Sequence, residues 1–179
     1  MNPRHANFFK IILQTKVIMI EIRKAIEADH DAIWEIIYQV LQGGDTYSFA
    51  PESTREQMMA YWFAPGKHTY TALFDGKIAG TFAICDNQPG LGSHVANGAF
   101  MVLALYAGKG IGKTMGGFSL HEARRLGYKA MQFNFVVKSN TRAVKLWQSL
   151  GFNIVGEVPE AFSHRQLGLT NTYVMYQKL

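Results

Sequence analysis

Hydrophobic residues recur along the chain in two periods, one typical of helices and one typical of strands. Apolar residues three or four positions apart predict helices, whereas alternating or unbroken apolar runs of about four to eight residues predict strands. The expected strands cover residues 20–24, 68–74, 77–85, 95–103, 130–137, 152–157 and 172–177. The expected helices follow Asp29, start at Ser53-Thr54, and cover residues 111–126 and 141–150. Because strands and helices are mixed along the chain, the pattern predicts an α/β fold.

Capping and turn residues mark where several of these elements begin and end. Asp29 is placed to cap the first helix, which stops at Gly43-Gly44. Ser53-Thr54 starts the second helix, and Pro65-Gly66 ends it. Asp75-Gly76 joins two strand patterns and is the strongest hairpin signal in the sequence. The opening strands are therefore expected to be antiparallel.

The second half of the chain alternates strand, helix, strand, helix, strand from residue 95 onward. Strands separated by a helix usually pair in parallel through right-handed crossovers, so parallel pairing is expected there. Together with the antiparallel opening strands, this order predicts a mixed sheet with helices on both faces.

Size and composition fit one folded domain. The chain has 179 residues, of which 48% are hydrophobic and 17% charged, which is enough apolar content for a core. No apolar run reaches the about 18 residues of a membrane span, because Lys10, Gln14 and Lys16 interrupt the early apolar segment. We expect an N-terminal extension over residues 1–18, a domain over residues 19–179, no membrane partner and a cytoplasmic location.

Net charge and cysteine content narrow the classes of ligand. The formal charge of +5 and the isoelectric point of about 9.3 suit an anionic ligand. Nucleic acid is not expected, because the basic residues are scattered and no zinc-finger or RNP-like signature is present. Cys85 is the single cysteine, which excludes an internal disulfide and a cysteine-rich metal site, and no metal is expected.

A glycine-rich turn is the clearest binding motif. Residues 106–114 read Tyr-Ala-Gly-Lys-Gly-Ile-Gly-Lys-Thr, between an expected strand and an expected helix. Backbone N–H groups in such a turn bind anions, and Lys109 and Lys113 add positive charge. Gly116 and Gly117 lie within the helix, where each costs about 1 kcal/mol against alanine. Something is therefore expected to approach the helix backbone closely at these two glycines.

The same stretch nearly matches the phosphate-binding loop G-x-x-x-x-G-K-[ST], with Ala107 at the first glycine. Nucleotide-hydrolysing enzymes with this loop need a second apolar strand that ends in aspartate to hold magnesium. The next strand ends in Lys138 instead, and the aspartate that follows a strand, Asp86, lies upstream. A P-loop NTPase or kinase remains an alternative that this context does not favour.

Two segments in register resemble the GCN5-related N-acetyltransferase (GNAT) superfamily. Gly110-Ile111-Gly112 resembles the core of its R/Q-x-x-G-x-G/A cofactor motif, although Ala107 stands at the first position. A second run resembles the family's N-x-x-A-x-x-L-Y-x-x-x-G-F, through Asn140, Ala143, Leu146, Trp147, Leu150, Gly151 and Phe152. The resemblance covers roughly residues 19–179, and the tail is similar to the branch that acetylates small-molecule amines and amino acids. It implies a mixed, mostly antiparallel sheet with a central splayed parallel strand pair and helices on both faces.

The resemblance also implies an acetyl-CoA site between strands 95–103 and 130–137. In the family, the pantetheine arm lies in the gap between the splayed strands, and backbone amides of the glycine turn hold the pyrophosphate. A backbone N–H near residues 101–103 would polarise the thioester oxygen. The implied coenzyme-binding residues are Met101, Val102, Leu103, Ala107, Gly108, Lys109, Gly110, Ile111, Gly112, Lys113, Asn140 and Ala143.

The residues for acetyl transfer itself are less evident. Asn134 would orient the reacting groups, or else is a strand amide bonded to its neighbours. Trp147 stands where the family's tyrosine protonates the departing thiolate, and an indole N–H is no useful acid. Ser139 or a water would then donate the proton, or the thiolate leaves unaided. Asn97 and His164 are candidates for acceptor binding.

The sequence thus predicts an acetyl-CoA-dependent N-acetyltransferase that moves the acetyl group directly to a primary or secondary amine of a small molecule. Ala107 and Trp147 motivate the alternative of a catalytically inactive acyl-CoA-binding regulatory module. Acceptor specificity is expected in the loops of residues 43–50 and 159–171. A homodimer is left open.

Overall fold

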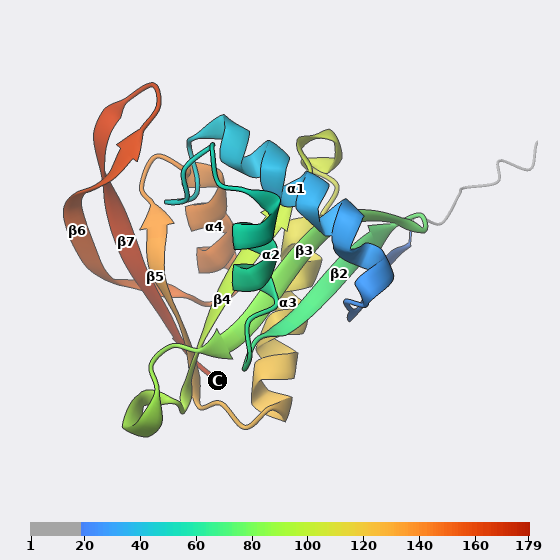
Figure 1. Cartoon of the computed structure of the whole chain (residues 1–179). Coiled ribbons are helices and arrows are strands. Elements are labelled where there is room, and N and C mark those ends of the chain that lie inside the picture. Colours follow the sequence, from blue (N-terminus) through green and yellow to red (C-terminus); the bar gives the residue numbers. More distant parts are fainter. Residues whose placement is uncertain (1–18) are drawn as a thin grey trace, which may run out of the picture.

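Residues 19–179 are described by the computed structural model, and they form a seven-stranded sheet with helices on both faces (Figure 1). The expected extension over residues 1–18 lies outside the described residues. The strands are β1 (Ile20–Lys24), β2 (His68–Phe74), β3 (Lys77–Asp86), β4 (Val95–Val102), β5 (Ala130–Val137), β6 (Asn153–His164) and β7 (Gly168–Lys178). The α-helices are α1 (His30–Gly43), α2 (Arg55–Trp62), α3 (Ile111–Arg125) and α4 (Thr141–Ser149). Short 3₁₀ turns are η1 (Glu27–Asp29), η2 (Gly90–Gly92) and η3 (Ala104–Tyr106).

The sheet order is β1-β2-β3-β4-β5-β7-β6, and the β4–β5 pair is parallel whereas the other neighbouring pairs are antiparallel. The parallel pair is joined at Val95–Ala130 and Ala96–Met131, after which the two strands diverge (Figure 1). The predicted mixed sheet with a splayed central pair is thus confirmed.

The pairing predicted for the end of the chain is wrong. Strand β7 lies between β5 and β6 and is antiparallel to both, so β6 is not a parallel neighbour of β5. Residues 158–171, expected as a loop, instead extend the two strands into a long hairpin. Two strands joined by a short turn can pair antiparallel with each other. Here β6 pairs with β7 in this way, instead of pairing with β5 through a helical crossover. Pro159 and the positive φ of 50° at Glu160 mark a break in the register of β6, and this break hides the strand pattern in the sequence.

The helices begin and end close to the predicted residues. Gly44 ends α1 with a left-handed φ of 62°, and Thr54 caps α2 by accepting the Gln57 N–H at 3.2 Å. The predicted capping role of Asp29 is not found. Its carboxylate instead accepts the Ile26 N–H at 2.9 Å and pairs with Arg23 at 2.7 Å, and this pairing lowers the pKa of Asp29.

Two hydrophobic layers cover the sheet. One lies between the sheet and helices α1 and α2, and the other between the sheet and helices α3 and α4. Strand β4 contributes to both layers, because Met101 packs with the first and Phe100 with the second. Within residues 19–179, no helix combines the length and apolarity that a membrane span requires.

Helices α3 and α4 approach each other at Gly116. A Cβ there would collide with Leu150 and would lie 3.0 Å from the Trp147 ring. The expected close approach is therefore confirmed for Gly116. For Gly117 it is wrong, because nothing in the described part of the chain lies within 4 Å of a Cβ there.

Candidate functional site

A cleft of about 930 Å³ opens where β4 and β5 diverge. Its walls come from both strands, the glycine turn, helix α4 and the loop after α1. The cleft brings together Asn97, Asn134, Trp147 and all the predicted coenzyme-binding residues except Lys109. Ser139 and His164 do not line it.

The glycine turn is shaped to present backbone N–H groups. Gly108 and Gly110 have φ values of 79° and 83°, which favour glycine, and the space beside Gly108 is open. Helix α3 begins directly after Gly110, so its first N–H groups have no partner within the helix. Lys109 points elsewhere, since its ammonium lies 4.8 Å from the Phe74 ring centroid.

The charged side chains that line the cleft are mostly cationic. The cleft is lined by one carboxylate, that of Asp45, and by four cations: Lys67, Lys113, Arg142 and Lys145. Burial lowers the pKa of Lys67, whose ammonium lies 3.0 Å from the Tyr61 ring centroid. A cleft of this charge favours a polyanionic ligand.

The backbone of β4 presents alternate N–H groups to β3 and to the gap. The Leu103 N–H donates to the Ala79 carbonyl at 2.9 Å, which assigns Leu103 and Met101 to the β3 side. The N–H groups of Val102 and Phe100 are then directed into the gap, where β5 has moved away. Within residues 101–103, Val102 is thus the residue whose N–H faces the predicted donor site.

Two side chains of the protein occupy the other gap-facing groups of β4. The Tyr47 hydroxyl accepts the Phe100 N–H at 2.8 Å and donates to the Phe100 carbonyl at 2.9 Å. The Asn97 Oδ1 accepts the Gly98 N–H at 2.8 Å. Burial raises the pKa of Tyr47, so its phenol stays protonated near neutral pH. Sequence reasoning missed Tyr47, because nothing distinguishes it from the other aromatic residues of its loop.

Asn134 lies in the cleft, but its amide is engaged on both sides. It donates to the Asn87 Oδ1 at 2.6 Å and accepts from the Gln132 amide at 2.8 Å. Asn134 and Phe135 are both exposed although they are neighbours in one strand, because the β5–β7 register shifts there. This irregularity presents the Asn134 amide at the cleft wall.

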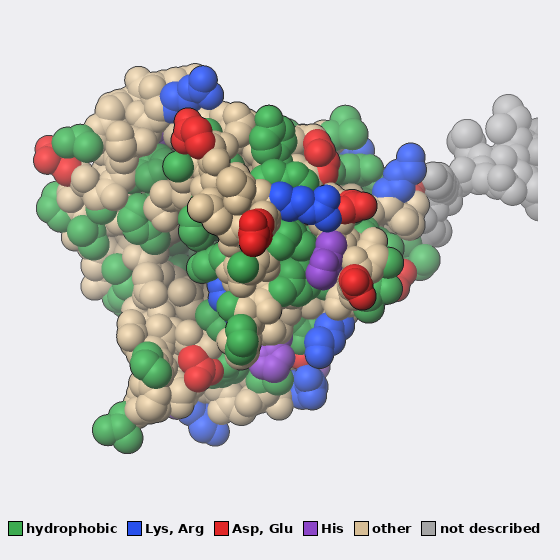
Figure 2. Space-filling model, viewed as in Figure 1, with side chains coloured by type: hydrophobic (Ala, Val, Ile, Leu, Met, Phe, Trp, Pro, Cys, Tyr) green, Lys and Arg blue, Asp and Glu red, His purple; other side chains and the backbone are tan. Residues whose placement is uncertain are grey.

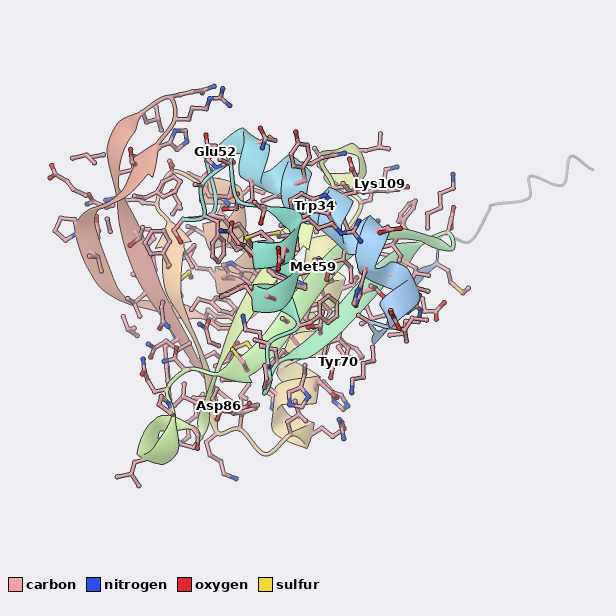
Figure 3. The ribbon with its side chains drawn as sticks, in the orientation of Figure 1. Trp34, Glu52, Met59, Tyr70, Asp86 and Lys109 are labelled. Atoms are coloured by element: carbon pink, nitrogen blue, oxygen red, sulfur yellow. The ribbon has the colours of Figure 1, made fainter. Side chains whose placement is uncertain are left out.

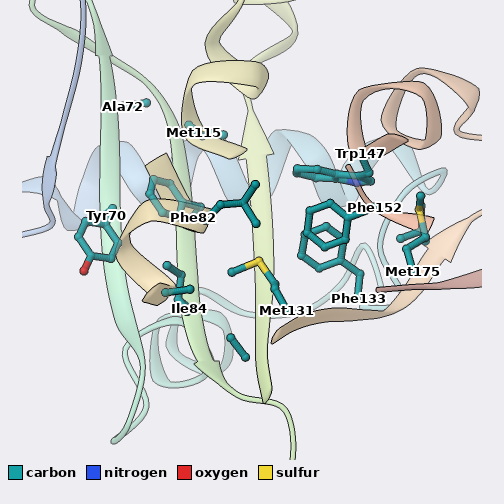
Figure 4. Close-up of a cluster of buried hydrophobic side chains, with 14 of the residues drawn as sticks. Tyr70, Ala72, Phe82, Ile84, Met115, Met131, Phe133, Trp147, Phe152 and Met175 are labelled. Atoms are coloured by element: carbon teal, nitrogen blue, oxygen red, sulfur yellow. The ribbon is translucent and has the colours of Figure 1, made fainter. Parts of the chain in front are cut away.

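Trp147 is part of the core as well as of the cleft wall. Its ring centroid lies 4.7 Å from that of Phe133 and 6.0 Å from that of Phe152 (Figure 4). The centroid of the Phe100 ring lies 4.8 Å away. The side chain is 7% exposed. Trp147 therefore closes one side of the cleft with an aromatic surface that carries no ionisable proton.

A smaller hollow lies beside the cleft. Three of the predicted site residues line this hollow: Ser139, Asn140 and His164. Asn140 caps α4 as predicted, because its Oδ1 accepts the Ala143 N–H at 3.1 Å. The Ser139 Oγ is buried and has no hydrogen-bond partner among the described residues. His164 Nδ1 accepts the N–H of Gln166 at 3.1 Å and so supports the β6–β7 turn.

The magnesium site of a P-loop enzyme is not found in the described residues. Asp86 pairs with Ala96, at the opposite end of β4 from the glycine turn, which places it about 20 Å away along the strand. Figure 3 shows Asp86 and Lys109 at opposite ends of the sheet. Among residues 19–179, no three histidine, cysteine or acidic side chains gather in a way that could hold a metal ion.

The central parallel strands thus part beside a glycine turn and a helix N-terminus that are able to bind an anion. The Acetyltransferase (GNAT) family matches residues 34–152, and the chain belongs to this family.

Known proteins resemble the chain in sequence, in fold or in both. A GCN5-related N-acetyltransferase from Kribbella flavida is 41% identical, with a TM-score of 0.85 over 89% of this chain and 98% of that one. YncA from Salmonella typhimurium, solved with its cofactor acetyl-CoA, is 22% identical, with a TM-score of 0.79 over 90% and 94% of the two chains. N-acetyltransferase aca1 of Schizosaccharomyces pombe is 31% identical over a 137-residue alignment, and the match covers 68% of this chain and 66% of that protein. The chain thus spans just under two thirds of the length of aca1.

Proposed function

We propose that residues 19–179 form an N-acetyltransferase domain that moves the acetyl group of acetyl-CoA to the amine nitrogen of a small molecule. The observation that carries the proposal is the cleft itself. One continuous wall joins the open glycine turn to the unpaired edge of β4, and cations outnumber carboxylates along it. Membership of the GNAT family and the relatives named above support the same reaction.

The residues of the cleft suit the two ends of the donor. The turn amides of residues 108–112 and the start of α3 would bind the pyrophosphate, with charge from Lys113 and Arg142. The Val102 N–H would bind one carbonyl group of the extended arm. Bound there, acetyl-CoA supplies an activated acetyl thioester.

The far end of the cleft suits a small acceptor. The Arg165 N–H donates to the Gly44 carbonyl at 3.1 Å, and its guanidinium donates to the Gln42 carbonyl at 3.0 Å. This contact joins the β6–β7 turn to the end of α1 and would enclose the acceptor on that side. Asn134 would orient the amine there, beside Asn97.

Proton transfer would not involve Trp147, whose indole is a poor acid. Ser139 lies outside the cleft, so water is the better-supported donor to the departing thiolate. The pKa of a thiol is about 8.5, so the thiolate is a moderate leaving group and needs little assistance.

Two assays test the proposal. Calorimetry with acetyl-CoA and with Mg-ATP, followed by thiol-release assays on amino acids, polyamines and drug-like amines, should show coenzyme binding and turnover on at least one amine class. Gly110→Val should weaken coenzyme binding by about tenfold or more, because its side chain enters the turn and strains a positive φ. Binding without turnover on any amine would favour the inactive acyl-CoA-binding module, and Mg-ATP binding alone would favour the P-loop alternative.

A homodimer is a further proposal about assembly. Strand β6 is the edge of the sheet, and it exposes Ile154, Val155 and Val158. Exposed apolar residues on an edge strand favour pairing with another chain. Light scattering coupled to size exclusion should give the mass of two chains, and a single-chain mass at micromolar concentration would refute this proposal.

A further inference from the structure

The hydroxyl of Tyr47 makes hydrogen bonds that a neighbouring strand would make in an unbroken sheet. It accepts the Phe100 N–H at 2.8 Å and donates to the Phe100 carbonyl at 2.9 Å, at the point where β5 has diverged. Tyr47 reaches there from the loop of residues 44–54, across 53 positions in sequence. One side chain therefore satisfies both backbone groups of Phe100.

These hydrogen bonds matter because the gap is the wall of the proposed donor site. A buried backbone group without a partner costs about 1–3 kcal/mol, so the free protein is stabilised by any group that fills this position. The phenol oxygen accepts the Phe100 N–H as a carbonyl oxygen of a ligand would.

An extended ligand that enters from the glycine turn meets the gap-facing N–H groups of β4 in order. Val102 comes first and Phe100 second, about 7 Å farther along the strand. Extended ligands that lie along a strand edge bond to alternate residues, so an arm bound at Val102 reaches Phe100 next. At Phe100 the arm meets the Tyr47 hydroxyl.

We propose that Tyr47 is a positioning residue whose hydroxyl holds the place of the donor's thioester carbonyl at the Phe100 N–H and leaves when the donor binds. The inference rests on the proposed function, because the donor is the acyl thioester of that reaction. Tyr47 thereby couples the occupancy of the donor site to the loop of residues 44–54, which lines the acceptor end of the cleft. Donor binding releases this loop from β4.

The test is Tyr47→Phe, which keeps the ring and removes the hydroxyl. The free variant should be less stable than the wild type, because Phe100 loses both partners. Its affinity for acetyl-CoA should rise about three- to thirtyfold, because no internal group has to be displaced. The matched control is Tyr70→Phe, whose hydroxyl donates to Glu122 at 2.6 Å and which does not line the cleft. This control should lose stability without any gain in affinity.

Calorimetry and thermal unfolding with and without acetyl-CoA separate the outcomes. Unchanged or weaker binding by Tyr47→Phe, with normal binding by the wild type, overturns the inference and leaves Tyr47 as a loop anchor. No binding by the wild type overturns the proposed function itself. If the variant does not fold, hydrogen exchange on the wild type decides. The donor should speed exchange in residues 44–54 and slow it in residues 108–113, and slower exchange in both segments would refute the inference.

Discussion

At the scale of single residues, Trp147 shows how one side chain can serve packing and a site together. Its indole contacts the rings of Phe100 and Phe133, and Gly116 of α3 leaves room for its edge. Aromatic contacts of this kind contribute about 0.5–1.5 kcal/mol each beyond the area they bury. The position is thus fixed by the core, whatever the reaction requires of it.

Trp147→Tyr should therefore lower stability by about 1–3 kcal/mol, because the smaller ring leaves a void among the neighbouring aromatic residues. Turnover at saturating substrate should stay flat or fall, since in the proposed reaction water rather than Trp147 supplies the proton. Chemical unfolding and steady-state kinetics measure the two effects, with Trp147→Phe as the control for lost volume. A severalfold gain in turnover that Trp147→Phe does not share would contradict this expectation.

Asn134→Ala should reduce kcat by about tenfold to a thousandfold and leave acetyl-CoA affinity almost unchanged, if its amide orients the reacting groups. Asn87→Ala is the matched control, because it removes the 2.6 Å partner of Asn134 but keeps the Asn134 amide in the cleft. Equal losses of kcat in the two variants would mean that the hydrogen bond between Asn134 and Asn87 matters, rather than the Asn134 amide itself. Unaltered kinetics in Asn134→Ala would make it a strand amide only.

The site could be predicted from sequence where its parts are local. Asn140 caps the helix that follows it by accepting the N–H of Ala143, three residues along the chain, and the glycine turn is a continuous segment. Both features can therefore be recognised from the local sequence. Tyr47 and Asn87 contact residues 53 and 47 positions away, and such partners depend on the finished fold. His164 was expected at the acceptor site, but the β6–β7 hairpin places it beside the neighbouring hollow.

At the scale of elements, the neighbouring glycines of α3, Gly116 and Gly117, allow the effect of helix propensity on stability to be distinguished from the effect of packing. Gly116 faces α4, where a Cβ would lie 3.0 Å from Trp147, whereas nothing described lies within 4 Å of a Cβ at Gly117. The two positions share one helix and one backbone conformation. Substituting each in turn therefore isolates the effect of the neighbouring helix.

Gly117→Ala should stabilise the protein by about 0.5–1 kcal/mol, because alanine restricts the unfolded chain and meets no neighbour. Gly116→Ala should destabilise it by about 1–3 kcal/mol, because the added methyl group pushes α4 away from α3. Urea unfolding of both variants measures the difference. If both variants were stabilised, the close contact between α3 and α4 would be refuted.

Strand and helix boundaries were predictable where the local signal was unbroken. Strands β2 and β5 have the predicted bounds, His68–Phe74 and Ala130–Val137, because apolar runs and turn residues delimit them. The β6–β7 hairpin was not predictable in this way. The residues of β6 are largely exposed, so no buried face imposes an apolar alternation on this strand. The order in which strands pair depends on residues far apart in the sequence, and the rule for helical crossovers predicted β6 instead of β7 as the neighbour of β5.

At the scale of the whole molecule, the sheet consists of two halves that meet at a narrow seam. Two residue pairs join β4 to β5, and further links between the halves include the α3–α4 contact, the ring contact of Phe100 with Phe133 and the hydrogen bond of Arg165 to Gly44. In Figure 2, charged side chains gather over α1, whereas hydrophobic and uncharged side chains prevail over the β6–β7 hairpin. A ligand in the cleft would touch both halves, because residues of β4 and β5 both line it.

The buried carboxylate of Glu122 should contribute to the dependence of global stability on acid. Arg125 pairs with it at 2.7 Å and lowers the pKa of Glu122 to about 2, against the opposing effect of burial, while Tyr70 of β2 donates to it at 2.6 Å. The unfolded chain, whose glutamate pKa is 4.5, binds this proton more readily than the folded protein. The stabilisation is therefore complete above pH 4.5 and is lost as the pH falls towards about 2.

Glu122→Gln should lower the free energy of unfolding at pH 7 by on the order of 2 kcal/mol, the size usual for a hydrogen-bonded charged group. The difference from the wild type should shrink steadily below pH 4.5, because protonation removes the same charge from the wild type. Other carboxylates titrate in both proteins, so the difference between the two curves isolates Glu122. Urea unfolding at pH 7, 5, 4 and 3 measures it. A difference that stayed constant across this range would mean that Glu122 stabilises the fold by shape alone, and the ion pair with Arg125 would then contribute nothing to the attachment of α3 to the sheet.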